Sequence, residues 1–139
     1  VVKGKGEAQK VAEALFEERI STGQFTSDHY YSDWFWKNTD EKNWSDIKNL
    51  VDKAMGNLTS YSLVSWNVQS KIHTANLSGT FVVLVYATTY DKGNGTETLT
   101  IHKPLRGDTF SILGHHFNSQ QIQQLINKGI KQVATRNDV

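Results

Sequence analysis

The fold is decided by residues 80–117, "TFVVLVYATTYDKGNGTETLTIHKPLRGDTFSILGHHF". β-Branched and aromatic residues alternate with polar ones along this stretch. Two turn sequences interrupt it, "DKGNG" at 91–95 and "PLRGD" at 104–108, and a third, "ANLSG" at 75–79, precedes it. Strands are therefore predicted at 61–73, 80–90, 96–103 and 109–117.

Paired in chain order as an antiparallel meander, the four strands share one apolar face under a single register. The residues predicted to face inward are Val64, Trp66, Val68, Ile72, Phe81, Val83, Val85, Ala87, Leu99, Ile101, Phe110 and Ile112. The opposite face is predicted to be mostly polar, with Ser65, Asn67, Gln69, Lys71, Thr98, Thr100 and His102. An antiparallel sheet with one dry face needs helices to cover that face.

Apolar residues repeat with a helical period in three other segments. These segments are residues 6–21, 39–58 and 119–134. Gly23 is expected to end the first helix, and Gly56 the second, which Thr39 or Asp40 caps at its start. The sequence thus predicts an α+β fold in one domain, residues 1–139. Its N-terminal helices pack on one face of a four-stranded antiparallel meander sheet, and a C-terminal helix closes the chain.

Composition limits the classes of function. The 139 residues include 15 Lys and Arg against 14 Asp and Glu, which is too balanced for a dedicated nucleic-acid-binding protein. Cysteine is absent, so disulfides and thiolate chemistry are excluded. No apolar run approaches the ~18–20 residues that a membrane span needs. The chain starts at Val1 without an initiator Met, which predicts a processed or trimmed N-terminus, with removal of an export signal as one explanation.

The histidines are candidate metal ligands. The register predicts His102 and His115 on the polar face, and His116 on the core side near Asp91. Consecutive strand residues point to opposite faces, so His115 and His116 cannot ligate one metal unless Gly114 introduces a bulge. Zinc needs three or four converging ligands, so neither a metal site nor another cofactor is predicted.

Catalytic motifs give no positive indication. The phosphate-binding glycine patterns, G-x-S-x-G and H-E-x-x-H are all absent from the sequence. The carboxylate pairs Asp40/Glu41 and Glu17/Glu18 fit a helix start and a solvated helix face. No catalytic residue is predicted, and the balance is against an enzyme.

Aromatic residues gather between positions 25 and 44, which allows two interpretations. The rings can pack the helices onto the sheet. Alternatively they can wall a pocket for a small apolar or sugar-like ligand between the helices and the sheet. The candidate pocket residues are Asp28, Tyr30, Tyr31, Trp34, Trp44 and His116.

An apolar patch is predicted on the outward face of the sheet, where exposure would be costly. Its residues are Val82, Leu84, Tyr86 and Leu113, with His102 at the rim. A homodimer that pairs the two sheets through this patch is one explanation. The other is that the closing helix, 119–134, covers the patch in a monomer.

Two segments, "KNWSDIKNLVDKAMGNLTSYSL" at 42–63 and "GTETLTIHKPLRGDTFSILGHHF" at 95–117, resemble a family of small exported bacterial domains of unknown function. The family belongs to the cystatin-like, nuclear-transport-factor-2-like group of α+β folds. The resemblance covers roughly residues 7–117. An aromatic residue commonly follows the strand glycine in that family, and here His115 stands at that position.

The resemblance carries no catalytic motif and implies a non-catalytic accessory or binding domain that contacts a protein or a cell-envelope component. It also implies a bacterial source and export, to the periplasm or as a lipid-anchored protein, with a cytoplasmic location as the alternative. The alternative function is a small-molecule or enzymatic pocket between the aromatic segment and the sheet.

Overall fold

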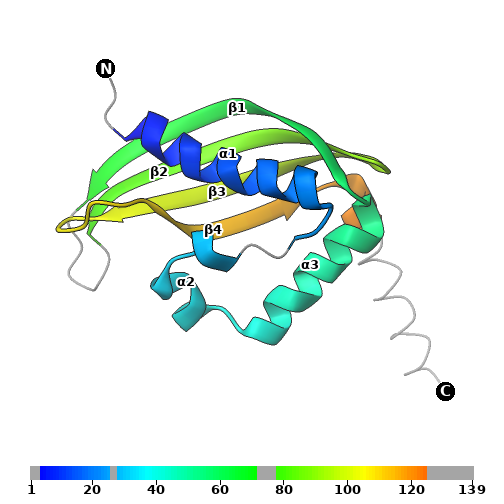
Figure 1. Cartoon of the computed structure of the whole chain (residues 1–139), viewed down its shortest axis with the longest axis horizontal. Helices are drawn as coiled ribbons and strands as arrows, with labels where there is room; N and C mark the ends of the chain where they lie inside the picture. Colours follow the sequence, from blue (N-terminus) through cyan, green and yellow to red (C-terminus); the bar gives the residue numbers. More distant parts are fainter. Residues whose placement is uncertain (1–3, 26–27, 72–77, 125–139) are drawn as a thin grey trace.

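The chain folds into a four-stranded antiparallel sheet with helices packed on one of its faces (Figure 1). The computed structural model describes residues 4–25, 28–71 and 78–124. Its elements are α1 (Lys5–Thr22), the 3₁₀ turn η1 (Asp28–Tyr30), α2 (Asp33–Asn38), α3 (Glu41–Met55), β1 (Leu58–Lys71), β2 (Gly79–Tyr90), β3 (Gly93–Pro104) and β4 (Ser111–Asn118). The strands follow the order β1-β2-β3-β4. The predicted α+β class and the meander are confirmed.

The helix ends follow the predicted caps. The Asp40 carboxylate accepts a hydrogen bond from the Lys42 N–H at 2.8 Å and starts α3. Gly23, at φ 69°, ends α1 with its N–H on the Arg19 carbonyl. A last helix begins at Gln120, after Ser119 accepts from the Ile122 N–H at 3.0 Å. The part of the predicted closing helix beyond residue 124 lies outside the described residues.

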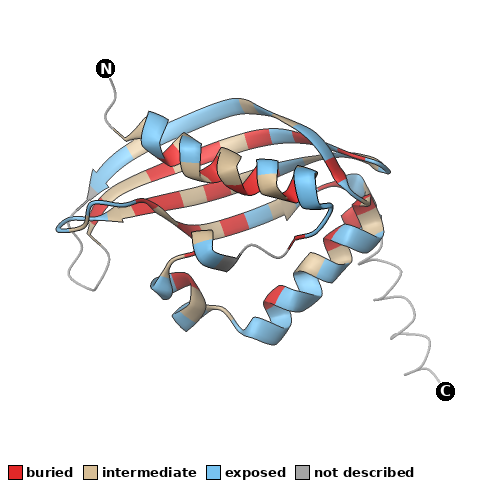
Figure 2. Ribbon diagram, in the orientation of Figure 1, coloured by how far each residue is buried: buried red, intermediate tan, exposed pale blue. Residues whose placement is uncertain are grey.

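The predicted apolar stripe of α1 faces the sheet. Ala8, Ala12, Leu15 and Phe16 have no exposed surface, and the Phe16 ring meets the Tyr86 ring edge to face at 4.8 Å. Figure 2 shows this buried side of the helix directed at the strands, with exposed residues along its outer side. The helix therefore covers the middle of the sheet.

The predicted faces of β2 are reversed. Val82, Leu84 and Tyr86 face the helices and are fully buried, and Val82 and Leu84 pair with Ile101 and Leu99 of β3. The residues predicted to face inward from β2 lie on the other face: Phe81, Val83, Val85 and Ala87. Both faces of this strand are apolar, so its alternation does not identify the inner side.

Two β-bulges account for further differences. The β1–β2 register shifts between Leu63 and Ser65, which leaves Val64 as an extra residue, 64% exposed. The β3–β4 register shifts so that Thr100 pairs with Gly114 and Ile101 with Ile112, which leaves Leu113 as the extra residue. Each bulge interrupts the period of two along its strand.

The predicted outward patch is therefore wrong. Val82, Leu84 and Tyr86 lie beneath the helices, and Leu113 is only 8% exposed. His102 is also buried. Its ring centroid lies 4.7 Å from that of Phe81, and its Nε2 donates a hydrogen bond to the Ser78 carbonyl at 2.8 Å.

No helix in the described part of the chain combines the length and the apolar character needed to cross a membrane.

Candidate functional site

The aromatic segment packs the helices onto the sheet. Tyr31, Phe35 and Trp44 are each at most 5% exposed. Their ring centroids lie 4.7 to 5.3 Å apart, and Phe25 meets Trp44 edge to face at 5.8 Å. Such offset and edge-to-face contacts are the favoured arrangement of aromatic rings. These rings fill the space between the helices and the sheet, where the alternative interpretation placed a ligand pocket.

The five predicted pocket residues whose side chains the structure describes do not form one site. Tyr31 and Trp44 belong to the buried cluster, whereas the Tyr30 hydroxyl donates to Glu18 at 2.9 Å. Trp34 is 37% exposed on α2. His116 is exposed and pairs with Thr98, and the Asp28 side chain lies outside the described residues. The predicted grouping of these residues into one pocket is therefore wrong. Trp34 instead borders a hollow on the surface.

The two adjacent histidines have exchanged their predicted faces. His115 pairs with Leu99 and is buried on the helix side, while His116 points outward. The bulge at Leu113 is the physical reason, because one extra residue reverses every side chain after it. Within the described residues, no three His, Asp, Glu or Cys side chains converge to hold a metal.

A buried polar network surrounds His115. The Arg19 guanidinium donates to Glu97 Oε1 at 2.9 Å and to the Tyr90 hydroxyl at 2.7 Å. Tyr90 in turn donates to Glu97 Oε2. His115 Nε2 lies 2.8 Å from Glu97 Oε1, and the Tyr31 hydroxyl lies 2.9 Å from His115 Nδ1.

The proton positions in this network follow from its acceptors. A carboxylate only accepts, so His115 Nε2 carries a proton and donates it to Glu97. Neutral His115 then accepts at Nδ1 from the Tyr31 hydroxyl. The Arg19 guanidinium also lies 4.0 Å from the centre of the Phe25 ring. The five network residues thus satisfy one another.

Electrostatics keep the network in one charge state. Burial alone would raise the pKa of Glu97, but the Arg19 charge and the His115 hydrogen bond outweigh it and lower that pKa from 4.5 to about 2. Burial lowers the pKa of His115 below 6.5, against the opposing attraction of Glu97. Burial and then the Glu97 charge raise the pKa of Tyr90. The network contains an ionised Arg–Glu pair beside neutral His and Tyr.

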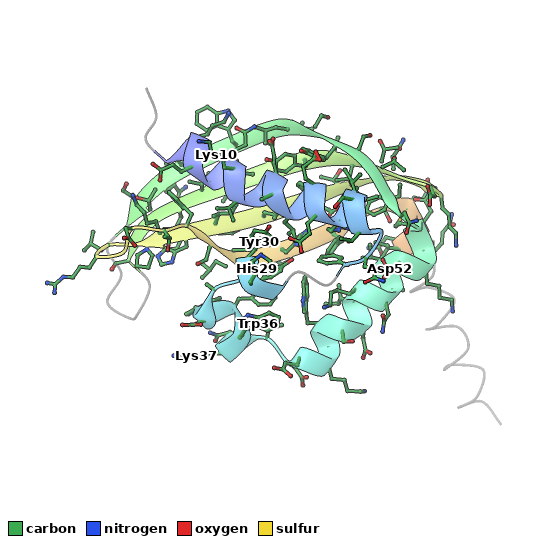
Figure 3. The ribbon with its side chains drawn as sticks, viewed as in Figure 1. Lys10, His29, Tyr30, Trp36, Lys37 and Asp52 are labelled. Atoms are coloured by element: carbon green, nitrogen blue, oxygen red, sulfur yellow. The ribbon has the colours of Figure 1, made fainter. Side chains whose placement is uncertain are left out.

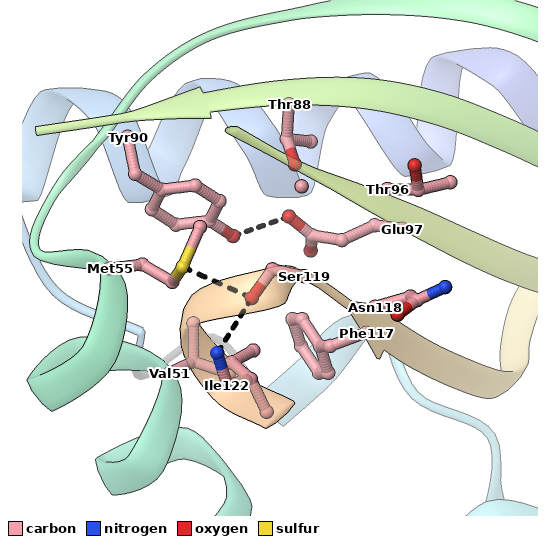
Figure 4. Close-up of a pocket in the computed structure, with 11 residues that line it drawn as sticks. Val51, Met55, Thr88, Tyr90, Thr96, Glu97, Phe117, Asn118, Ser119 and Ile122 are labelled. Atoms are coloured by element: carbon pink, nitrogen blue, oxygen red, sulfur yellow. Dashed lines mark hydrogen bonds between the residues drawn. The ribbon is translucent and has the colours of Figure 1, made fainter. Parts of the chain in front are cut away.

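No organic ligand has room beside Glu97 in this network. The Arg19, Glu97 and His115 side chains are at most 4% exposed. The pocket next to Glu97 offers about 10 Å³, which is the volume for one water molecule, and Thr88, Tyr90 and Ser119 line it (Figure 4). The Thr88 hydroxyl has no hydrogen-bond partner among the described residues.

A larger hollow lies on the surface between α2 and the ends of β3 and β4. This Trp34 hollow measures about 320 Å³ and is lined by Ser32, Asp33, Trp34, Lys37, His102, Pro104 and Ser111. His102 is held in place by the hydrogen bond that its Nε2 donates to the Ser78 carbonyl. Lys37 extends from α2, as Figure 3 shows.

Two other surface depressions flank α3. One, of about 420 Å³, is lined by Trp36, Glu41, Trp44, Ser45 and Lys48. The other is a groove of about 220 Å³ formed mainly by apolar residues of α3 and β4, among them Ile47 and Phe117. His115 borders this groove, but its side chain has no exposed surface, so the groove does not reach the network.

Comparisons with protein families, with curated proteins and with solved structures find no match to this chain. The family resemblance and the cystatin-like assignment therefore stay predictions, and the function has to be argued from the geometry of the site.

Proposed function

We propose that the chain is a non-catalytic binding domain whose Trp34 hollow takes a neutral saccharide unit of a cell-envelope component. Export stays part of this proposal and rests on the family resemblance alone. The observation that carries the proposal is the composition of the hollow, where a 37% exposed indole stands beside carboxylate, ammonium, hydroxyl and imidazole groups.

Size and chemistry favour a ring-shaped polar ligand. Ligand pockets usually measure about 300–1,000 Å³ and combine aromatic walls with a few placed polar groups. The Trp34 hollow, at about 320 Å³, is of a size for one or two sugar rings. A sugar presents an apolar C–H face that can stack on Trp34, and hydroxyl groups that can bond Asp33, Lys37 and His102.

Charge favours a neutral ligand over an anion. Asp33 and Lys37 carry opposite charges and stand four residues apart on α2. Together they contribute no net charge, whereas sites for phosphate groups usually gather several cations. An uncharged saccharide therefore fits this lining better than a phosphorylated ligand does.

The network supports the non-catalytic part of the proposal. A general acid or base must come within about 2.6–3.2 Å of the group it acts on. Glu97 and His115 make their hydrogen bonds with Arg19, Tyr90, Tyr31 and each other, and the pocket beside Glu97 has room for no more than one water molecule. Their role in this account is to stabilise the fold.

Saccharide binding is expected to depend on Trp34. A glycan array followed by calorimetry on the neutral sugars it retains should give weak binding, with a Kd on the order of 1 mM. Trp34→Ala should weaken that binding at least about tenfold, because the stacking surface is lost. Trp66→Ala is the matched control, since Trp66 is 44% exposed and lies on β1 away from the hollow. Absence of any retained neutral sugar, or equal binding by the two variants, would contradict the proposal.

A further inference from the structure

Strand β1 is an open edge of the sheet. Among the described residues it pairs only with β2, because it stands first in the strand order. The opposite edge is occupied, since Tyr31 forms a bridge with Ile112 and the Ser32 N–H donates to the Ile112 carbonyl at 2.8 Å. Figure 1 shows β1 along the outer border of the sheet, with no other described strand beyond it. Within the described part of the chain, the outer backbone groups of β1 are therefore available for pairing.

This edge is uncharged along most of its length. Natural edge strands carry lysines, prolines or inward-pointing charges that prevent association. Residues 58–70 contain no charged residue and no proline, although 21% of the whole chain is charged, and Lys71 is the one charged residue of the strand, at its end. Two register irregularities interrupt the edge, one between Leu58 and Ser60 and the bulge at Val64. Two of the five exposed large apolar side chains of the described residues, Val64 at 64% and Trp66 at 44%, lie within three positions on it.

We propose that the β1 edges of two copies of this chain pair in antiparallel fashion about a two-fold axis and form an eight-stranded sheet. This inference is independent of the saccharide site. Two-fold homodimers are the commonest assemblies of soluble proteins, and their interfaces place one surface against itself.

A second copy suits this edge because self-pairing creates no charge conflict. Around a two-fold axis each residue of one strand meets a residue of the identical strand, so a charged residue would often face a like charge. Residues 58–70 of β1 offer only apolar and neutral polar side chains, including Ser62, Ser65, Asn67 and Gln69. Lys71, at the end of the strand, would lie opposite its own copy only if the axis passed through it. A charged partner peptide would find no complementary charge along the same residues.

Burial of apolar side chains would stabilise the pairing of two β1 edges. Lys5 Nζ lies 5.6 Å from the centre of the Trp66 ring and covers only part of it. Burial of Val64 and Trp66 against a second copy would remove most of this exposed apolar surface from water. Backbone hydrogen bonds along the edge would set the orientation, as in other strand-addition interfaces.

Sedimentation equilibrium over a concentration series tests the proposal. The wild-type chain should be a dimer at the higher concentrations. Val64→Lys and Trp66→Lys should each weaken dimerisation at least about tenfold, because a lysine on the edge opposes pairing. Leu105→Lys is the matched control, since Leu105 is 63% exposed in the turn after β3 and should leave the dimer unchanged.

Circular dichroism establishes that each variant is folded, and two separate edge variants keep the test informative if one of them fails to fold. A wild-type chain that is monomeric up to its solubility limit would overturn the proposal. A dimer that folded edge variants leave unchanged would also overturn it. Saccharide binding should persist in both edge variants, which separates this outcome from failure of the Trp34 hollow.

Discussion

Replacement of Arg19 by methionine should lower the free energy of unfolding by about 3–5 kcal/mol, the usual cost of removing one partner from a buried ion pair. Methionine keeps much of the apolar contact of the Arg19 stem, so the loss is chiefly electrostatic. Glu97, 1% exposed, would lose the positive charge that balances its own and keep, among the described residues, only the hydrogen bonds from Tyr90 and His115. Urea unfolding at neutral pH, followed by circular dichroism and extrapolated to water, measures this change.

Two further variants separate the ion pair from the helix itself. Lys10→Met on the exposed side of α1 (Figure 3) should change stability by no more than about 0.5 kcal/mol. The double variant Arg19→Met, Glu97→Gln should lose less than the sum of the two single changes, because the second change removes the uncompensated charge. A loss below about 1 kcal/mol for Arg19→Met would show that the network does not stabilise the fold.

Acid should destabilise the protein in two stages. The pKa of His115 is lowered in the folded state. As the pH drops below about 6.5, His115 is therefore protonated in the unfolded chain before it is protonated in the folded chain, and the free energy of unfolding falls. The pKa of Glu97 is lowered from 4.5 to about 2, so a second loss follows between these values. For Glu97 the full loss is roughly 3 kcal/mol. Both stages have the same sign, because both folded-state pKa values lie below the unfolded ones.

Urea unfolding repeated from neutral to acidic pH checks this dependence. His115→Gln keeps a donor toward Glu97 and should remove the first stage, whereas His116→Gln changes an exposed neighbour and should retain it. Equal stability at pH 3 and pH 7 in the wild-type chain would contradict the charge states assigned to the network.

Most of the secondary structure could be predicted from sequence, because its signals are local. The caps at Asp40 and Gly56 and the turns between strands act within a few residues. The inner face of β2 could not be predicted, since residues 81–86 are apolar on both faces. Bulges are also poorly encoded, and the one at Leu113 decided which histidine is buried.

The buried network was missed for a different reason. Arg19 stands four residues after Leu15 on the buried stripe of α1, and Glu97 stands two residues before Leu99 on the inner face of β3. Arg19 and Glu97 therefore each stand at a position that the apolar pattern assigns to the core. A charged residue at such a position was the sequence signal that could have indicated the network. Their pairing spans 78 residues and depends on how α1 lies across the sheet, which no local pattern specifies. The Trp34 hollow likewise joins α2 to the ends of two distant strands.

We propose that a neutral saccharide binds in the Trp34 hollow and that the buried network does not contact it. Titration of the ¹⁵N-labelled protein with the best neutral sugar from the array, followed by amide and indole shifts, tests it most directly. The predicted result is a set of shifts around Trp34, Lys37 and His102, with the signals of Glu97 and His115 unchanged. Shifts centred on Glu97 and His115, or on the depression at Trp36, would contradict it.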